Sequence, residues 1–174
     1  TPLMVAVDGL KSKATEALIA LGADPNAKAE DGASPMSLAA ENHRQSPNLI
    51  TTLVDHGGDP NILRPNRDPL VMRFVVDRDC DRIALLKSYG ANLNAETRNG
   101  DPVIASAATA GNWDMVWCLI QLGADYDYEA SPRRALSRSL ALPFPPPGTP
   151  LYEFKKKVGD FLAQKGLAVP DLPR

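Results

Sequence analysis

The sequence predicts an all-α protein, a solenoid in which pairs of helices follow one another along the chain. Three observations predict this fold class. A glycine-containing loop occurs four times, at separations of 35, 33 and 33 residues, and a capping residue followed by proline recurs with nearly the same period. Two helical segments lie between one loop and the next. In such proteins each unit buries its apolar face against its neighbours, so the period of the repeat describes the architecture.

The repeated loop begins at four glycines: Gly22, Gly57, Gly90 and Gly123. Glycine takes a left-handed backbone conformation at little cost, so we expect each glycine to end a helix. The third residue of the loop is polar in every copy: Asp24, Asp59, Asn92 and Asp125. These residues look like a row of carboxylates, but their place in the loop predicts that they serve its backbone.

Each first helix is expected to begin at a capping residue and a proline: Thr1-Pro2, Ser34-Pro35, Asp68-Pro69 and Asp101-Pro102, with a weaker fifth pair at Ser131-Pro132. The side chain of the first residue accepts a bond from a helix N–H, and proline suits the first helical position. Three residues before these prolines, Gly32, Asn66 and Asn99 are expected to make a left-handed turn.

A second, more apolar helix follows. Its apolar residues keep the spacing of one helical face. They are Leu49, Ile50, Leu53 and Val54, then Ile83, Leu85 and Leu86, then Val116, Leu119 and Ile120.

The C-terminal part is less regular. Residues 131–142 are expected to form an inner helix, and the proline-rich segment 143–150 separates it from an outer helix at 151–166. The apolar face of that helix comprises Leu151, Phe154, Val158, Phe161 and Leu162. We interpret this part as a fifth, capping repeat with a stiff connector, since terminal repeats are atypical. The alternative is that PFPPPG docks into an aromatic-lined groove of a partner.

The unit of turn, helix, helix and loop resembles the ankyrin repeat. The matching stretches are TPLM at 1–4, GADPNA at 22–27, DGASPMSLAA at 31–40 and GNWDMVWCLIQLGAD at 111–125. The whole chain, 1–174, is then one domain with repeats at about 1–33, 34–67, 68–100 and 101–130 and the capping repeat at 131–174.

The sequence also departs from the ankyrin pattern. The family's histidine is replaced by Met4, Ser37, Val71 and Ile104. Extra residues are expected in the helix–helix turns of the second to fourth repeats. Arg73 and Phe74 stand where the family usually has two alanines.

Composition and motifs exclude several classes of function. A net charge of −2 does not favour nucleic acid, and no apolar run reaches the roughly 18–20 residues of a membrane span. No catalytic motif, metal-ligand spacing or cofactor motif occurs, so we expect neither an enzyme nor a metal or cofactor site. We expect His43 and His56 to be exposed polar residues, Cys118 to lie in the core and Cys80 to lie in a helix–helix turn. Two cysteines leave the redox compartment open.

The chain begins at Thr1 rather than methionine. We expect the natural start to lie upstream, where a signal peptide or lipid anchor would be out of view. The compartment therefore stays open between a bacterial periplasm and cytoplasm.

The resemblance implies that loop tips and the groove beside the inner helices bind another protein. Carried over by register, the candidate binding residues are Glu30, Asp31, Arg64, Arg67, Arg73, Arg98, Tyr126, Asp127, Tyr128, Arg134 and Arg138, with Thr97 a further tip residue and Glu41 and Val76 further groove positions. Tyrosine and arginine are enriched at binding hot spots.

Two hypotheses of protein binding follow from the resemblance. In the first, the chain restrains a partner enzyme, as do bacterial ankyrin-repeat immunity proteins that neutralise a secreted toxin such as a lipase effector. In the second, it is an adaptor that joins two proteins.

Overall fold

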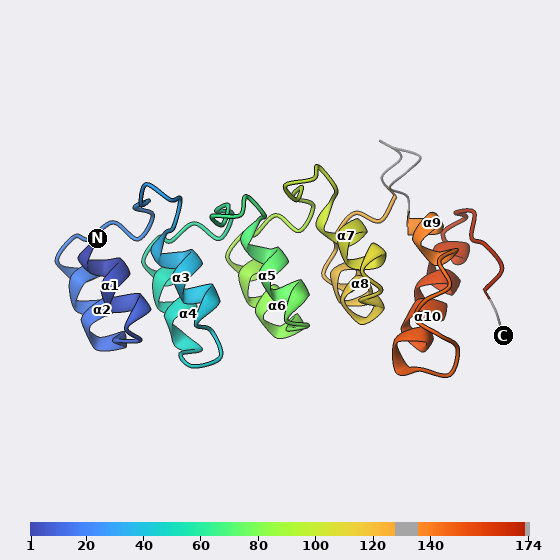
Figure 1. Cartoon of the computed structure of the whole chain (residues 1–174), viewed down its shortest axis with the longest axis horizontal. Coiled ribbons are helices and arrows are strands. Elements are labelled where there is room, and N and C mark those ends of the chain that lie inside the picture. Colours follow the sequence, from blue (N-terminus) through green and yellow to red (C-terminus); the bar gives the residue numbers. More distant parts are fainter. Residues whose placement is uncertain (128–135, 173–174) are drawn as a thin grey trace. The chain divides into compact units, whose positions relative to one another are not determined.

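The computed structural model describes residues 1–127 and 136–172, which form ten helices and two isolated β-bridges (Figure 1). The helices are α1 Pro2–Asp8, α2 Ser12–Ala20, α3 Pro35–Glu41, α4 Asn48–Asp55, α5 Leu70–Val76, α6 Cys80–Ser88, α7 Val103–Thr109, α8 Trp113–Gln121, α9 Leu136–Leu140 and α10 Pro150–Gln164. Within the described residues the prediction of an all-α protein is confirmed.

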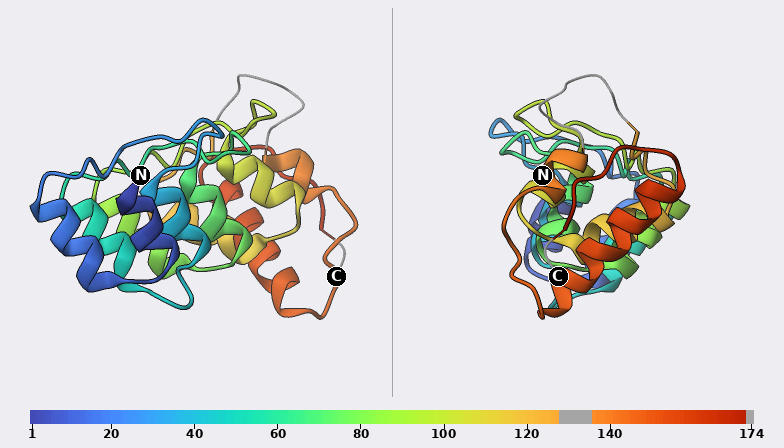
Figure 2. Two further views of the ribbon diagram at one scale, coloured as in Figure 1. Left: turned by 60° about the vertical axis from the view of Figure 1, so that its left-hand side comes forward. Right: turned by 90° about the vertical axis from the view of Figure 1, so that its right-hand side faces the viewer.

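The described chain divides into two compact units. Unit 1 comprises Thr1–Arg73 and Ser88–Ala91, and unit 2 comprises Phe74–Lys87 and the described residues from Asn92 onward. In unit 1, α1 packs against α2 and α3, and α4 packs against α2 and α3 (Figures 1 and 2). In unit 2, α7 packs against α8 and α9, and α10 packs against α8 and α9.

Each unit has its own set of fully buried apolar side chains. In unit 1 they include Leu3, Met36, Leu49, Ile50 and Leu53, and in unit 2 they include Phe74, Ile83, Leu86, Ile104 and Trp113. Full burial of one such side chain contributes roughly 1.5–3 kcal/mol. Leu49, Ile50 and Ile83 are among these buried residues, so the apolar periodicity of the second helices predicted these core positions correctly.

Two of the first helices begin with the predicted cap. The Thr1 hydroxyl accepts a bond from the Met4 N–H at 3.2 Å, and the Ser34 hydroxyl accepts one from the Ser37 N–H at 3.1 Å. α10 has a cap that the sequence analysis did not predict, since Thr149 accepts from the backbone of its first turn. All three helices have proline in their first turn.

The predicted helix starts at Pro69 and Pro102 are wrong by one residue. α5 begins at Leu70 and α7 at Val103, while each proline takes part in an isolated β-bridge with the preceding loop. The bridge keeps the proline extended, so the helix starts after it. These prolines correspond to the capping Ser34, at spacings of 35 and 33 that match those of the loop glycines.

This shift moves two further assignments. The histidine of the ankyrin pattern corresponds to the third residue of the helix. In α5 and α7 this residue is Met72 and Ala105, each one position after the predicted Val71 and Ile104. The residues that replace the alanine pair are Phe74 and Val75, both fully buried. Arg73 precedes that pair and is half-buried rather than part of the core.

The left-handed turns before the helices also differ from the prediction. The residues with positive φ are Gly32 at 83°, Arg67 at 66° and Gly100 at 74°, not Asn66 and Asn99. The N–H of each of the three donates to the carbonyl three residues earlier, at 3.0, 2.7 and 2.8 Å. Asparagine precedes the left-handed position in two of the turns and does not occupy it.

The helix–helix turns are shorter than predicted. Three residues join α1 to α2, α5 to α6 and α7 to α8, and each turn contains one residue with positive φ: Leu10, Arg78 or Gly111. Six residues, 42–47, join α3 to α4. The extra residues expected in three repeats are therefore confined to this one turn.

The polar side chains at the third position of the glycine loops form hydrogen bonds with the backbone, as predicted. Each side chain accepts a hydrogen bond from the N–H two residues later, at 2.8–3.0 Å: Asp24 from Asn26, Asp59 from Asn61, Asn92 from Asn94 and Asp125 from Asp127. These Asx turns fix the loop locally. The four side chains are thus hydrogen-bonded within their own loops.

Asparagine side chains then link successive loops, which the sequence analysis did not predict. The Asn26 amide donates to the Gly57 carbonyl at 2.8 Å and accepts from the Asp59 N–H at 2.7 Å. The corresponding contacts run from Asn61 to Gly90 in unit 1 and between Asn94 and Asp125 in unit 2. These bonds set the register of neighbouring loops through backbone groups.

The C-terminal part of unit 2 contains α9 and α10 with a proline-rich connection (Figure 2). Residues 131–135 of the expected inner helix, including Ser131-Pro132, lie outside the described residues. In α10 the predicted apolar residues Val158 and Leu162 are buried, while Leu151, Phe154 and Phe161 are half-buried. The apolar face predicted for this helix is therefore only partly covered.

Lys155 of α10 is buried, with 1% of its surface exposed. Its ammonium donates to the carbonyls of Leu142, at 2.5 Å, and Phe144, at 3.3 Å, and lies 5.8 Å from the Trp113 ring centroid. Burial lowers the pKa of Lys155 from its ordinary value. The lysine thus fixes the proline-rich segment to α10.

Candidate protein-binding surface

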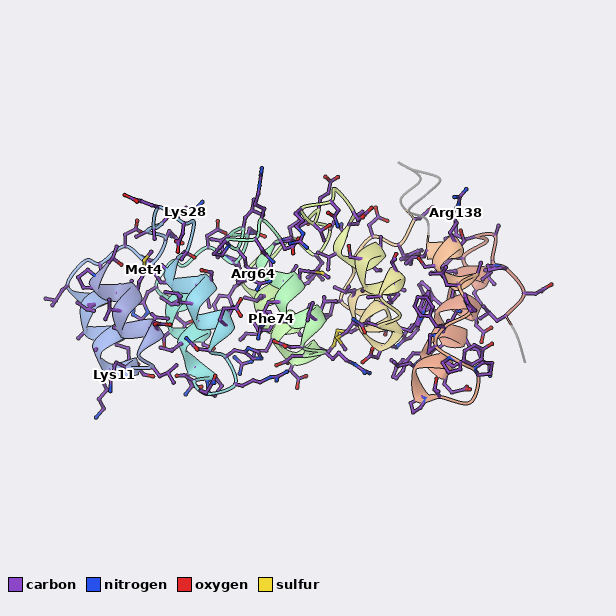
Figure 3. The ribbon with its side chains drawn as sticks, viewed as in Figure 1. Met4, Lys11, Lys28, Arg64, Phe74 and Arg138 are labelled. Carbon is purple, nitrogen blue, oxygen red and sulfur yellow. A yellow bond between two sulfur atoms is a disulfide. The ribbon has the colours of Figure 1, made fainter. Side chains whose placement is uncertain are left out.

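In unit 1 the loops that precede α3 and α5 lie side by side at one end of the helices. Each closes with a backbone bond, from Ala29 N–H to Ala33 at 2.8 Å and from Arg64 N–H to Asp68 at 2.9 Å. A Cβ added at Gly32 would lie 3.8 Å from the Pro65 Cα, so the two tips lie close together. Figure 3 shows Lys28 at this end of unit 1 and Lys11 at the opposite end.

Three candidate residues meet beside these loops. Glu41, at the end of α3, accepts a bond from Arg64 of the second loop and another from Arg73 of α5, the latter at 2.6 Å. Each arginine takes a different oxygen of the carboxylate. Charge-assisted bonds of this kind are stronger than neutral ones, and a shared carboxylate fixes both arginines.

Exposure decides which member of this cluster faces a partner. The side chains of Arg64 and Arg73 are 15% and 24% exposed, whereas that of Glu41 is 45% exposed. The two arginines therefore hold Glu41 in place, and the carboxylate is the group offered to solvent. The sequence analysis named the arginines as contact residues and gave Glu41 only as a groove position.

The remaining unit 1 candidates, Glu30, Asp31 and Arg67, are exposed at the loop tips. Asp31 also accepts a bond from the Ala33 N–H at 2.9 Å, which anchors its carboxylate to the loop. Arg67 lies at the left-handed position of its turn. Unit 1 thus offers charged groups of both signs on two neighbouring loops.

The unit 2 candidates are less uniform. Arg98, Asp127 and Arg138 are exposed, while Thr97, expected at a tip, is buried with 8% exposure. Tyr126 is half-buried and its ring packs edge-on against Phe161 at 5.1 Å between centroids.

This packing of Tyr126 reduces the surface that it offers to a partner. Tyr128 and Arg134 lie outside the described residues. The groove candidate Val76, at the end of α5, is 60% exposed.

A tyrosine at the end of the helices makes a further polar contact in unit 1. The Tyr89 hydroxyl donates to Asp55 at 2.5 Å. This hydrogen bond, together with partial burial and the charge of the carboxylate, raises the pKa of Tyr89 above its ordinary value of 10.0. Tyr89 therefore stays neutral at physiological pH.

The histidines are used locally. His43 is buried with 3% exposure, which corrects the expectation that it is exposed, and its Nδ1 lies 2.8 Å from the Ala40 carbonyl. His56 is exposed, with its Nδ1 2.8 Å from the Thr52 carbonyl. In the part of the chain that the structure describes, no three His, Cys, Asp or Glu side chains gather as metal ligands would.

Sequence reasoning also missed a disulfide between Cys80 and Cys118, which lie on α6 and α8 of unit 2. The two cysteines are 38 residues apart, so neither motif spacing nor loop register suggested the pair. Cys80 is the first residue of α6 rather than a turn residue.

None of the described helices has the length and apolar character that a membrane crossing requires.

Comparison with known proteins finds a partial likeness. No family model matches the chain. A stretch of 84 residues is 34% identical to the human protein SH3 and multiple ankyrin repeat domains protein 2, and the alignment covers 47% of this chain and 4% of that protein. This match supports ankyrin-like repeats in the chain. It favours a non-catalytic domain that interacts with other proteins, although the chain spans only a small part of that relative.

Proposed function

We propose that this chain is a protein-binding module, a solenoid of four ankyrin-like repeats closed by an irregular capping repeat. The observation that carries the proposal is the pair of neighbouring loops in unit 1, with Glu41 held outward by two arginines. Asx turns and asparagine links order these loops before any partner arrives. Ordered loops lose little conformational entropy on binding, so their charged tips can contribute affinity and specificity.

The proposed binding groups in unit 1 are Glu30, Asp31, Glu41 and Arg67, with Arg64 and Arg73 as positioning residues. Both signs of charge are present in one small area, which suits the mixed surface of a protein better than a polyanion. In the rest of the chain, Arg98, Tyr126, Asp127, Tyr128, Arg134 and Arg138 remain proposed contacts.

Substitution of Arg67 by glutamate tests the surface. The change preserves a long side chain at the left-handed position, so it alters charge with little effect on the turn. If Arg67 is an interface anchor, Arg67→Glu combined with Glu41→Gln should weaken partner binding by roughly 30-fold, or about 2 kcal/mol. Titration calorimetry with the partner captured from the source cells measures this change.

Lys11→Glu is the control for the charge reversal at Arg67, because it makes the same change from a positive to a negative side chain at the opposite end of the helices (Figure 3). Its affinity should stay within about twofold of the original, since a single exposed charge far from an interface contributes little. Equal loss in both variants would show that overall charge, and not this surface, governs binding.

We further propose that the partner is a toxic enzyme whose activity the module restrains, as in bacterial immunity proteins. The sequence resemblance is the support for this narrower role. Cells that express the partner should survive with the original chain and die with the Arg67→Glu, Glu41→Gln variant. The alternative, an adaptor, requires two proteins bound at once, and a ternary complex in size-exclusion chromatography would favour it.

A further inference from the structure

We propose that Cys80 and Cys118 are an oxidative cross-linking site and that the protein functions with this disulfide closed, in an oxidising compartment. The two residues lie on neighbouring helices of unit 2 with their Cα atoms 6.1 Å apart. That separation falls within the 4.4–6.8 Å range typical of disulfides. Both cysteines of the chain are used, so none is left free in the described structure.

Beside the disulfide, a salt bridge joins the turn that precedes α6 to α8. The guanidinium of Arg78, two residues before Cys80, donates through Nε and Nη2 to one oxygen of Asp114 at 2.8 and 2.6 Å. Asp114 lies on α8, one helical turn before Cys118, and its side chain is only 13% exposed. This bridge brings the start of α6 to α8, so the thiols of the reduced protein already face each other.

The different burial of the two cysteines gives the order of the reaction. Cys80 is half-buried at the first residue of α6 and is therefore the more accessible sulfur, whereas Cys118 is 6% exposed. The Cys80 thiolate attacks the disulfide of an oxidising dithiol protein and expels one of its thiolates. The Cys118 thiolate then attacks the Cys80 sulfur of this mixed disulfide and expels the second.

In the overall reaction the two thiols of this protein lose two electrons and two protons, and the disulfide of the donor gains them and becomes two thiols. The donor must be a disulfide-bearing protein or small molecule of the compartment. In reducing compartments such cross-links rarely persist, so a permanently closed bond indicates the periplasm, a secretory lumen or the extracellular space. This inference does not depend on the proposed partner.

The first experiment counts thiols in the chain as its source cells make it. Acid quenching followed by maleimide labelling under denaturing conditions should modify no cysteine before reduction and two after reduction. Modification of both cysteines without reduction would show that the cross-link is open in the cell and would overturn the proposal.

The second experiment measures what the bond does to the fold. Reduction should lower the melting temperature by roughly 10 °C, because a 38-residue loop is released in the unfolded chain. The variant Cys80→Ala, Cys118→Ala should melt with the reduced protein and should not respond to the reductant. Equal melting temperatures of the oxidised protein and this variant would exclude a stabilising cross-link.

The third experiment tests the order of attack. In the Cys118→Ala variant, Cys80 should react with an aromatic disulfide reagent at least tenfold faster than Cys118 reacts in the Cys80→Ala variant. Melting curves of both variants show whether each is folded at the assay temperature. Faster reaction of Cys118 in the folded state would contradict the proposed sequence.

Discussion

Arg67 has a left-handed backbone conformation, which costs a residue with a Cβ about 1 kcal/mol relative to glycine. In the corresponding turns this position is Gly32 or Gly100. Arg67→Gly should therefore stabilise unit 1 by roughly 0.5–1 kcal/mol in urea unfolding, even though it removes a charged side chain. If Arg67 also binds the partner, the same variant should bind more weakly while being more stable. A destabilised Arg67→Gly variant would mean that the side chain supports the loop.

At Gly58 the surrounding atoms leave no room for a side chain, a constraint that cannot be read from the repeated loop sequence. The other three loops have alanine at this position: Ala23, Ala91 and Ala124. A Cβ at Gly58 would lie 2.8 Å from both the Leu53 carbonyl oxygen and the Met36 Cε. The unbranched side chain of Met36 is longer than those of Leu3, Val71 and Ile104 at the equivalent positions, so its terminal methyl occupies the space that the alanine would need.

Gly58→Ala should accordingly destabilise unit 1 by about 1–3 kcal/mol, the usual cost of overpacking. Met36→Leu, which shortens the side chain, should recover part of this loss in a double-mutant cycle followed by urea unfolding. The backbone contact with Leu53 limits the recovery. Additive effects of the two substitutions would show that the methionine is not the obstacle.

At the scale of elements, Lys155 fastens the proline-rich segment to α10. Lys155→Met should destabilise unit 2 by about 1–3 kcal/mol, because the carbonyls of Leu142 and Phe144 lose their donor. The exposed neighbour Lys156 is the matched control, and Lys156→Met should change stability by less than about 0.5 kcal/mol. A more stable Lys155→Met variant would show that the buried charge is a net cost.

The lowered pKa of Lys155 also gives a dependence on pH. The unfolded chain binds more protons than the folded chain between the lowered folded-state pKa and the ordinary value of 10.5. The contribution of Lys155 to stability therefore rises with pH across that interval. Stability measured by urea unfolding should show this rise in the original chain and lack it in Lys155→Met.

The glycine loops made most of the helices predictable, because each loop glycine follows the end of the second helix of its repeat. The proline pairs gave a false register in two places, since proline is favoured both at the first helical position, as in Pro35, and in the extended residue before it, as in Pro69. Local composition does not separate these two positions. The β-bridge that decides between them involves residues of the preceding loop.

The candidate surface was predictable only in outline. The register identified loop tips, which was sufficient to place Glu30, Asp31 and Arg67 at exposed positions. It did not show that Arg64 and Arg73 turn toward Glu41, because that depends on side chains of three different elements. The link between Cys80 and Cys118 was missed for the same reason.

At the scale of the whole molecule, the C-terminal part protects an apolar face of α8. Trp117 packs edge-on against Phe161 of α10 at 5.8 Å between ring centroids, and Lys157 lies 4.3 Å from the Trp117 ring centroid. Removal of 131–174 should expose this face and cause association, which light scattering would detect. A truncated protein that stayed monomeric with an unchanged melting temperature would show that this part is a dispensable tail.

The bond between Cys80 and Cys118 also changes how the chain bears mechanical load. Tension applied to the two ends passes through the sulfur atoms, so the residues between the cysteines carry no force while the bond is closed. A chain of 38 residues spans roughly 130 Å when fully extended. Pulled in an optical trap, the oxidised molecule should stop about 120 Å short of the length that the reduced molecule reaches. The missing length would be a direct count of the residues that the cross-link shields.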